Sequence, residues 1–160
     1  MKRNFLLLLF TLSALFVIPV TANGQSDKNI SVDLVLNSAE EKVNTGGVSA
    51  TLIIRNTGLS EVKAVHPSNR MAVTFIVMNS LGNVVAPIGL AKVDPFFKEI
   101  TIKPNLEVRQ SFPKLEFITG SALFGYELKK GEIYRIVAIY RPDGEKGVGI
   151  TTKEQIITVK

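Results

Sequence analysis

The sequence contains no cysteine, no tryptophan and a single histidine. Without cysteine the chain has no disulfide, no thiol nucleophile and no thiolate ligand for a metal ion. Zinc and copper usually bind several histidine or cysteine side chains, and this chain cannot supply them. Its one histidine, His66, stands in a turn-forming run with Pro67, Ser68 and Asn69, and no spacing around it suggests a catalytic triad. We therefore expect no catalytic residue, no metal site and no cofactor, and we expect that the protein is not an enzyme.

The longest apolar run of the chain lies at its beginning. Two basic residues precede an apolar stretch over residues 5–20, and small side chains follow up to Ala22, which is the order of a secretory signal. A membrane-spanning helix needs about 20 apolar residues, and this run is shorter. The pattern predicts a cleaved signal peptide over residues 1–22, export to the periplasm or the extracellular space, and no integral membrane anchor after cleavage.

The chain also lacks a concentrated run of basic residues. After residue 22, with Lys2 and Arg3 set aside, 17 basic residues face 14 acidic ones, a net charge of +3. Lys129 and Lys130 are the only adjacent basic pair in that part, whereas nucleic-acid binding needs a basic patch or stripe. We expect scattered, solvated charges and no nucleic-acid partner.

After a polar leader over residues 23–29, apolar residues alternate with polar ones in short segments that turn residues separate. The first segment has Ile30, Val32, Leu34 and Leu36 on one face, which is the period of a half-buried strand. Strands are expected over residues 30–36, 48–55, 61–65, 71–79, 84–86, 99–102, 106–112, 134–140 and 155–159. One helical turn is allowed within residues 120–128. Short strands at this spacing are typical of a sandwich or barrel, so residues 30–160 are expected to form one all-β domain.

The run Leu128-Lys129-Lys130-Gly131-Glu132-Ile133-Tyr134 leads directly into an alternating strand. It resembles the tyrosine corner of Greek-key sandwiches, in which the hydroxyl of the tyrosine bonds backbone upstream. The chain is thereby similar to immunoglobulin-like and fibronectin type III modules, without the cysteines and tryptophan of antibody domains. The resemblance implies an immunoglobulin-like Greek-key β-sandwich of about seven to nine strands. In such a sandwich the corner would be formed by Leu128, Gly131 and Tyr134. Strand F would then comprise residues 134–140, and strand G would comprise residues 155–159.

A second motif is Leu52-Ile53-Ile54-Arg55-Asn56-Thr57-Gly58, which precedes the strand at 73–79 and the turn Leu81-Gly82-Asn83-Val84-Val85. This pattern is similar to the BsuPI-type proteinase inhibitor family. The resemblance implies proteinase inhibition as an alternative function and specifies no inhibitory residue.

Two apolar features lie outside the expected core. The connection over residues 87–97 contains Phe96 and Phe97, and Val137 and Ile139 point away from the face that Tyr134 shares. Because large exposed apolar patches are scarce on monomeric proteins, these residues either cover the sandwich or contact a partner. We predict an exported, non-enzymatic domain that binds another exported protein or a cell-surface component, with these four residues as the candidate partner surface. A structural subunit that assembles through its strand edges is a further alternative.

Overall fold

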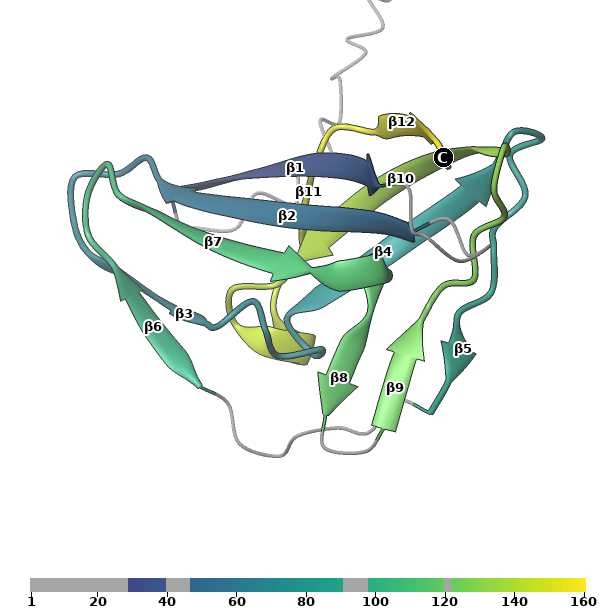
Figure 1. Cartoon of the computed structure of the whole chain (residues 1–160). Helices are drawn as coiled ribbons and strands as arrows, with labels where there is room; N and C mark the ends of the chain where they lie inside the picture. Colours follow the sequence, from purple (N-terminus) through teal and green to yellow (C-terminus); the bar gives the residue numbers. More distant parts are fainter. Residues whose placement is uncertain (1–28, 40–46, 91–97, 120–121) are drawn as a thin grey trace, which may run out of the picture.

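The computed structural model describes residues 29–39, 47–90, 98–119 and 122–160, which form an almost entirely β structure (Figure 1). The predicted signal peptide lies outside the described residues. No helix within these ranges is long and apolar enough to cross a membrane. The elements are β1 (Ile30–Ala39), β2 (Gly47–Asn56), β3 (Val62–Val65), β4 (Val73–Asn79), β5 (Ile88–Gly89), β6 (Glu99–Ile102), β7 (Glu107–Phe112), the 3-10 helix η1 (Pro113–Leu115), β8 (Phe117–Thr119), β9 (Ala122–Gly125), β10 (Ile133–Tyr140), the 3-10 helix η2 (Gly144–Lys146), β11 (Ile150–Thr151) and β12 (Gln155–Thr158).

One main sheet has the strand order β1-β2-β7, with both neighbouring pairs antiparallel. Alternate residues of β2 are fully buried, because a strand turns successive side chains to opposite faces. The register sets Leu34 opposite Leu52 and Ile54 opposite Val108. These cross-strand apolar pairs form the inner face of the sheet.

The other main sheet has β10 at its centre, paired antiparallel with β4 on one side and with β12 and β11 on the other. Along β10 the side chains of Tyr134, Ile136, Ala138 and Tyr140 are all buried, and the residues between them are more exposed. The hydroxyl of Tyr140 donates a hydrogen bond of 2.7 Å to the carbonyl oxygen of Val65. The alternation predicted for this strand is confirmed.

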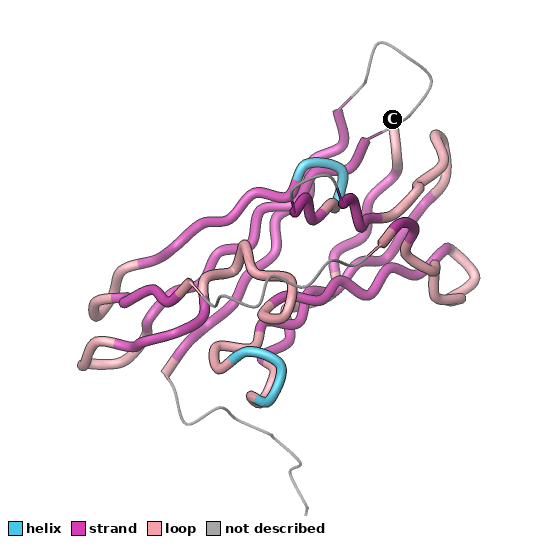
Figure 2. Tube along the Cα trace, turned by 90° about the horizontal axis from the view of Figure 1, so that it is seen from below, coloured by secondary structure: helices cyan, strands magenta, loops and turns pink. Residues whose placement is uncertain are grey.

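The core lies between the two main sheets, so the fold is sandwich-like. Figures 1 and 2 show the sheets as two layers in perpendicular views. Phe75 of β4 packs edge-on against Phe112 of β7, with ring centroids 5.1 Å apart. Such edge-to-face pairs stabilise a core beyond the area that they bury. With no cysteine in the chain, this packing supplies the stability that disulfides give to other domains.

Two smaller sheets extend the sandwich. The strands β3 and β6 pair with each other, and β5, β9 and β8 form a three-stranded sheet in that order. In Figure 1 they lie below the main sheets, at opposite sides of the view. The sheet of β5, β9 and β8 presents Phe117 and Phe124 as a cross-strand pair, and Phe117 contacts Phe75 of the core at 5.8 Å between ring centroids.

A buried asparagine ends β2 and joins two loops. The side chain of Asn56 is completely buried, and its Nδ2 donates to the carbonyl oxygens of Ser60 at 2.7 Å and Ile102 at 2.9 Å. Its Oδ1 accepts the backbone N–H of Gly58 at 2.9 Å. Both ends of the amide are thus satisfied, as burial of a polar group requires.

Three local expectations from the sequence are wrong. Residues 122–125 form β9 and no helical turn, because pairing with β8 overrides weak local preference. Val84 makes a single bridge to Met78, and residues 84–86 are no strand. Leu106 precedes β7 and is 55% exposed, so it does not share the buried face with Phe112.

Candidate binding groove

One edge of β4 carries backbone groups that β10 does not use. The carbonyl oxygens of Phe75 and Val77 point away from β10, as their hydrogen bonds show. The hydroxyl of Tyr126 donates to the carbonyl of Phe75, and the N–H of Val85 donates to the carbonyl of Val77. In an antiparallel ladder the N–H and C=O of one residue point to the same side. The N–H groups of Val73 and Phe75 therefore also face this outer edge, and neither has a backbone partner within the described ranges.

The far half of this edge pairs with residues 83–85, and no described strand pairs with the near half, where the hydroxyl of Tyr126 bonds the Phe75 carbonyl. The carbonyl of Val77 accepts the N–H of Val85 at 2.8 Å, and the N–H of Asn79 donates to the carbonyl of Asn83 at 2.9 Å. The segment over residues 83–85 thus completes the ladder beyond Ile76. About four residues of edge, 73–76, remain, which is about 13 Å of strand.

A groove of about 480 Å³ lies beside this half of the edge. On the core side it has aromatic walls from Phe117, Phe124 and Tyr126, and on the outer face of the sheet it reaches Thr74 and Ile76. Its lining residues are Arg70, Met71, Val73, Thr74, Phe75, Ile76, Val84, Val85, Pro87, Phe117, Phe124, Tyr126, Arg141 and Glu145. The groove thus combines apolar walls with main-chain N–H groups that have no strand partner, in residues that are themselves buried, Val73 at 1% and Phe75 at 3% exposure.

Tyr126 lines the groove and contacts the edge of β4. Its hydroxyl donates a short hydrogen bond, 2.6 Å, to the carbonyl oxygen of Phe75 on the strand edge. Partial burial raises the pKa of this phenol above its ordinary value, and the positive charge of Arg70 acts in the opposite direction. The phenol is therefore neutral at physiological pH and serves as a donor.

Arg70 and Arg141 are the basic residues of the groove. The guanidinium carbon of Arg70 lies 4.2 Å from the ring centroid of Phe124, a cation–π contact. Its Nε is buried, and no acceptor lies within hydrogen-bond distance of it in the described part of the chain. Arg141 differs, since its Nη1 donates to the hydroxyl of Thr74 at 2.9 Å.

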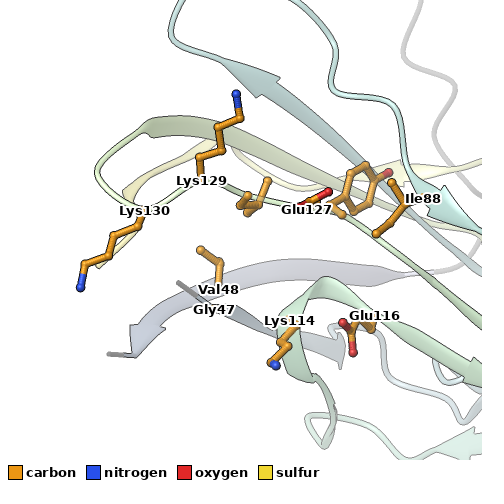
Figure 3. A pocket seen from close by; sticks show the side chains of 10 residues that line it. Gly47, Val48, Ile88, Lys114, Glu116, Glu127, Lys129 and Lys130 are labelled. Atoms are coloured by element: carbon orange, nitrogen blue, oxygen red, sulfur yellow. The ribbon is translucent and has the colours of Figure 1, made fainter. Parts of the chain in front are cut away.

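A second cleft, of about 510 Å³, lies on the other side of Tyr126 (Figure 3). Its charged lining residues are Lys114, Glu116, Glu127, Lys129 and Lys130. In Figure 3 the side chains of Lys129 and Lys130 point away from each other and out of the cleft. These charges do not converge on one point, as the recognition of a small anion or catalysis would require. We therefore take the groove along β4 as the candidate site.

The three residues of the predicted corner come together at the start of β10. Leu128 and Tyr134 are buried, and Gly131 has a φ of +83°, which favours glycine. The hydroxyl of Tyr134 accepts the backbone N–H of Lys129 at 3.1 Å and donates to Glu132 at 2.8 Å.

The candidate partner surface is only partly described. Val137 and Ile139 are half-buried on the outer face of β10, where Val137 lies opposite Ile76 of the groove. Gly149 covers Ile139, because a Cβ at Gly149 would lie 2.5 Å from its methyl group. Phe96 and Phe97 lie outside the described residues.

His66 is half-buried, with its Nδ1 accepting the backbone N–H of Ser68 at 3.1 Å. Burial lowers the pKa of His66, and the positive charge of Lys98 lowers it further. No group of three or more acidic or histidine side chains that could hold a metal ion occurs within the described ranges.

Sequence reasoning did not identify Arg70, Phe124 or Tyr126. They come from a loop, from β9 and from the segment after β9, and pairing of distant strands brings them to β4. The sequence feature that could have indicated them is the occurrence of three aromatic residues, at positions 117, 124 and 126, within ten residues. Aromatic residues this close together, in a segment without the period of a helix or strand, indicate a cluster in the tertiary structure.

Comparison with known proteins gives a fold likeness alone. No family model matches the chain, and no curated protein matches it. A solved structure titled "X-ray structure of Northeast Structural Genomics Consortium target SoR45" is similar, with a TM-score of 0.50 and 14% sequence identity over 82% of this chain and 87% of that one. At this identity the likeness supports the all-β, sandwich-like fold.

Proposed function

We propose that this protein is an exported, non-enzymatic binding domain that accepts an extended segment of a partner polypeptide in the groove beside β4. The observation that carries the proposal is the groove itself, in which the N–H groups of Val73 and Phe75 face aromatic walls. A strand that adds to a sheet edge gains affinity from main-chain hydrogen bonds and specificity from pockets for alternate side chains. Here one set of side chains would meet Phe117 and Phe124, and the other set Thr74 and Ile76.

The immunoglobulin-like part of the proposal draws on the strand order. The sheets β1-β2-β7 and β4-β10-β12 would correspond to strands A, B, E and C, F, G of a Greek-key sandwich. The bond between the Tyr134 hydroxyl and the Lys129 N–H supports a tyrosine corner at the entry to strand F. Export is proposed from the signal-like order of residues 1–22, and N-terminal sequencing of the native protein tests it.

Assembly with a second copy through the same edge is the second candidate function, because an open strand edge pairs with any extended chain. Sedimentation at increasing concentration separates the two functions. A stable dimer that Phe124→Ala dissociates would favour assembly. Proteinase inhibition stays a prediction from the BsuPI-type resemblance, and a panel of proteinases assayed with and without the chain tests it.

The direct test uses a display library of random seven-residue peptides selected on the purified chain. Amide hydrogen exchange is then followed with and without the enriched peptides. We expect the amides of Val73 and Phe75 to exchange at least about tenfold more slowly when a peptide is bound. The amide of Ile76 is the internal control, because it faces β10 in the free chain. Peptides that bind without slowing Val73 and Phe75, or a library that yields no binder, would overturn the proposal.

A further inference from the structure

The sheet around β10 carries apolar side chains on its outer face, the face that points away from the core. An antiparallel sheet with one face on the core is normally polar and solvated on the other. The sheet of β1, β2 and β7 follows this rule, since Asp33, Arg55 and Glu107 point outward from it. On the outer face around β10 the cross-strand register instead places the aliphatic side chains of Ile76, Met78, Ile133, Val137, Ile139 and Ile156. The two main sheets therefore present different chemistry to the solvent.

This outer face is accessible to a partner. Ile156 is 68% exposed and Ile133 is 46% exposed. Val84, which makes a bridge to β4, extends the face at 70% exposure. The members on β4 and in the middle of β10 are half-buried, as side chains between neighbouring strands are, and Gly149 covers Ile139 at one end. Contiguous exposed apolar patches are rare on monomeric proteins and mark sites of interaction.

The charge in the middle of the outer face is neutralised within the chain. Arg135 points outward from β10, between Met78 and Ile156 in the register. Its Nε donates to one carboxylate oxygen of Glu154 at 3.0 Å, and its Nη2 lies 2.8 Å from the other oxygen. Such a two-pronged pair leaves little net charge for a partner to meet. A strongly acidic or basic partner would therefore gain nothing here, whereas a surface that is itself apolar and neutral matches the face.

A second copy of the same outer face is such a surface, and the size of the face suits a dimer. β10 has eight residues, which is about 26 Å of strand, and β4, β10 and β12 with residues 83–85 span about 19 Å. Two such faces in contact would bury roughly 1,000 Å² in total, which is about the least that a specific interface needs. Interfaces between identical chains are also more apolar than those between different proteins. Composition and area thus both favour a second copy as the occupant.

We propose that the outer face of β4, β10 and β12 is the interface of a homodimer, in which two copies of this chain pack sheet against sheet with Val137 at the centre. Packed sheets lie about 10 Å apart with their strands about 30° apart, and a two-fold axis brings the same patch of both copies together. The interface borders the groove beside β4 at Ile76. The aromatic wall of the groove lies on the core side of β4, so the inference goes beyond the proposed peptide binding and does not rest on it.

Analytical ultracentrifugation of the purified chain tests the dimer. An apolar interface of this modest size predicts a weak, reversible dimer with a dissociation constant of about 1 to 100 µM. Val137→Lys and Val137→Glu each place like charges opposite one another across the interface, and each should weaken the dimer at least about 30-fold. An equal mixture of the two variants should form a mixed dimer at least about tenfold tighter than either variant alone, because the facing charges are then opposite.

The controls separate the outer face from other surfaces. Leu59→Lys is the matched control, because Leu59 is 97% exposed in the connection between β2 and β3, outside the sheet of β10, and this variant should dimerise as the wild type does. Phe124→Ala changes the groove and should also leave the dimer unchanged. Urea melts check that each variant folds. Should the Val137 variants fail to fold, Ile156→Lys and Ile156→Glu replace them, since that position is 68% exposed.

Three results would overturn the inference. The first is a chain that stays monomeric up to about 200 µM, which would leave the outer face to a different protein. The second is a dimer that persists in both charged variants, and the third is a mixture that dimerises no more tightly than its components. A dimer that Phe124→Ala dissociates and Val137→Lys does not would place the contact at the edge of β4 instead. Peptide binding in the groove stands or falls separately, because it is read from the amides of Val73 and Phe75.

Discussion

The most discriminating test of the fold is the change Asn56→Asp, because it replaces one NH₂ group by an oxygen without changing shape. Nδ2 of Asn56 donates to two backbone carbonyls, 2.7 and 2.9 Å away, in a fully buried site. The substitution removes both bonds and faces a carboxyl oxygen toward two acceptors. Leaving the buried carbonyl of Ile102 unsatisfied costs about 1 to 3 kcal/mol, the part-buried carbonyl of Ser60 costs less, and a carboxyl oxygen that faces both acceptors adds repulsion. We therefore expect a loss of about 3 to 5 kcal/mol in the free energy of unfolding at neutral pH, once partial relaxation is allowed for.

The pH dependence of this loss has a definite sign. Burial and the two carbonyls favour the protonated carboxyl, so the pKa of the introduced group is raised in the folded state above its unfolded value. The difference from wild type should therefore be smallest below about pH 4, where the unfolded chain is also protonated. It should grow as the pH rises, by at most about 1.4 kcal/mol per pH unit.

Asn79→Asp is the matched control in urea denaturation at two pH values. Oδ1 of Asn79 accepts the N–H groups of Leu81 and Asn83 at 3.0 and 2.9 Å, and a carboxylate can accept both. We expect a change within about 0.5 kcal/mol. Equal losses for the two variants, or a loss at Asn56 that does not shrink in acid, would refute the assignment of Nδ2 as a double donor.

Three further predictions concern single side chains. Tyr140→Phe should lower the free energy of unfolding by about 2 to 3 kcal/mol in denaturant melts, because it leaves a buried carbonyl without its donor. Tyr134→Phe should lower it by about 1 kcal/mol, because the hydroxyl of Tyr134 also bonds an exposed carboxylate. The reverse order would show that the buried hydrogen bond of Tyr140 is wrong. Gly89→Ala should lower the free energy of unfolding more than Gly131→Ala. Both glycines have a positive φ, but only a Cβ at Gly89 would collide with a backbone carbonyl of β9. Equal losses of stability would contradict the pairing of β5 with β9. Proton NMR should give His66 a pKa below about 6.5 because of burial. Stability should therefore fall as the pH drops through that value, and His66→Gln should abolish this dependence; a pKa at or above 6.5 would contradict the burial.

The strands that the sequence predicts are those long enough to alternate. Residues 134–140 and 48–55 correspond to β10 and β2, because burial on one face imposes a period of two on every long strand. β5 and β11 have two residues each and cannot show a period. They exist only through their pairing partners, which local sequence does not reveal.

The candidate groove escaped prediction for a related reason. The pattern at Tyr134 is local, since its hydroxyl partner Lys129 is five residues away. The contact of Arg70 with Phe124 and the bond of Tyr126 to Phe75 instead join distant parts of the chain. Such contacts depend on how the sheets pack, and hydrophobic periodicity carries no information about that.

The arrangement of the strands also bears on how quickly the protein folds. β1 and β2 are consecutive in the chain, but β4 pairs with β10 and β2 pairs with β7, so each main sheet is completed by strands from distant parts of the sequence. Closing those long loops costs entropy before the contacts repay it, and proteins of this kind fold in about milliseconds to seconds. We expect the β1–β2 pair to form early and the docking of β4 on β10 to limit the rate. The edge of β4 would then be among the last parts of the surface to take shape.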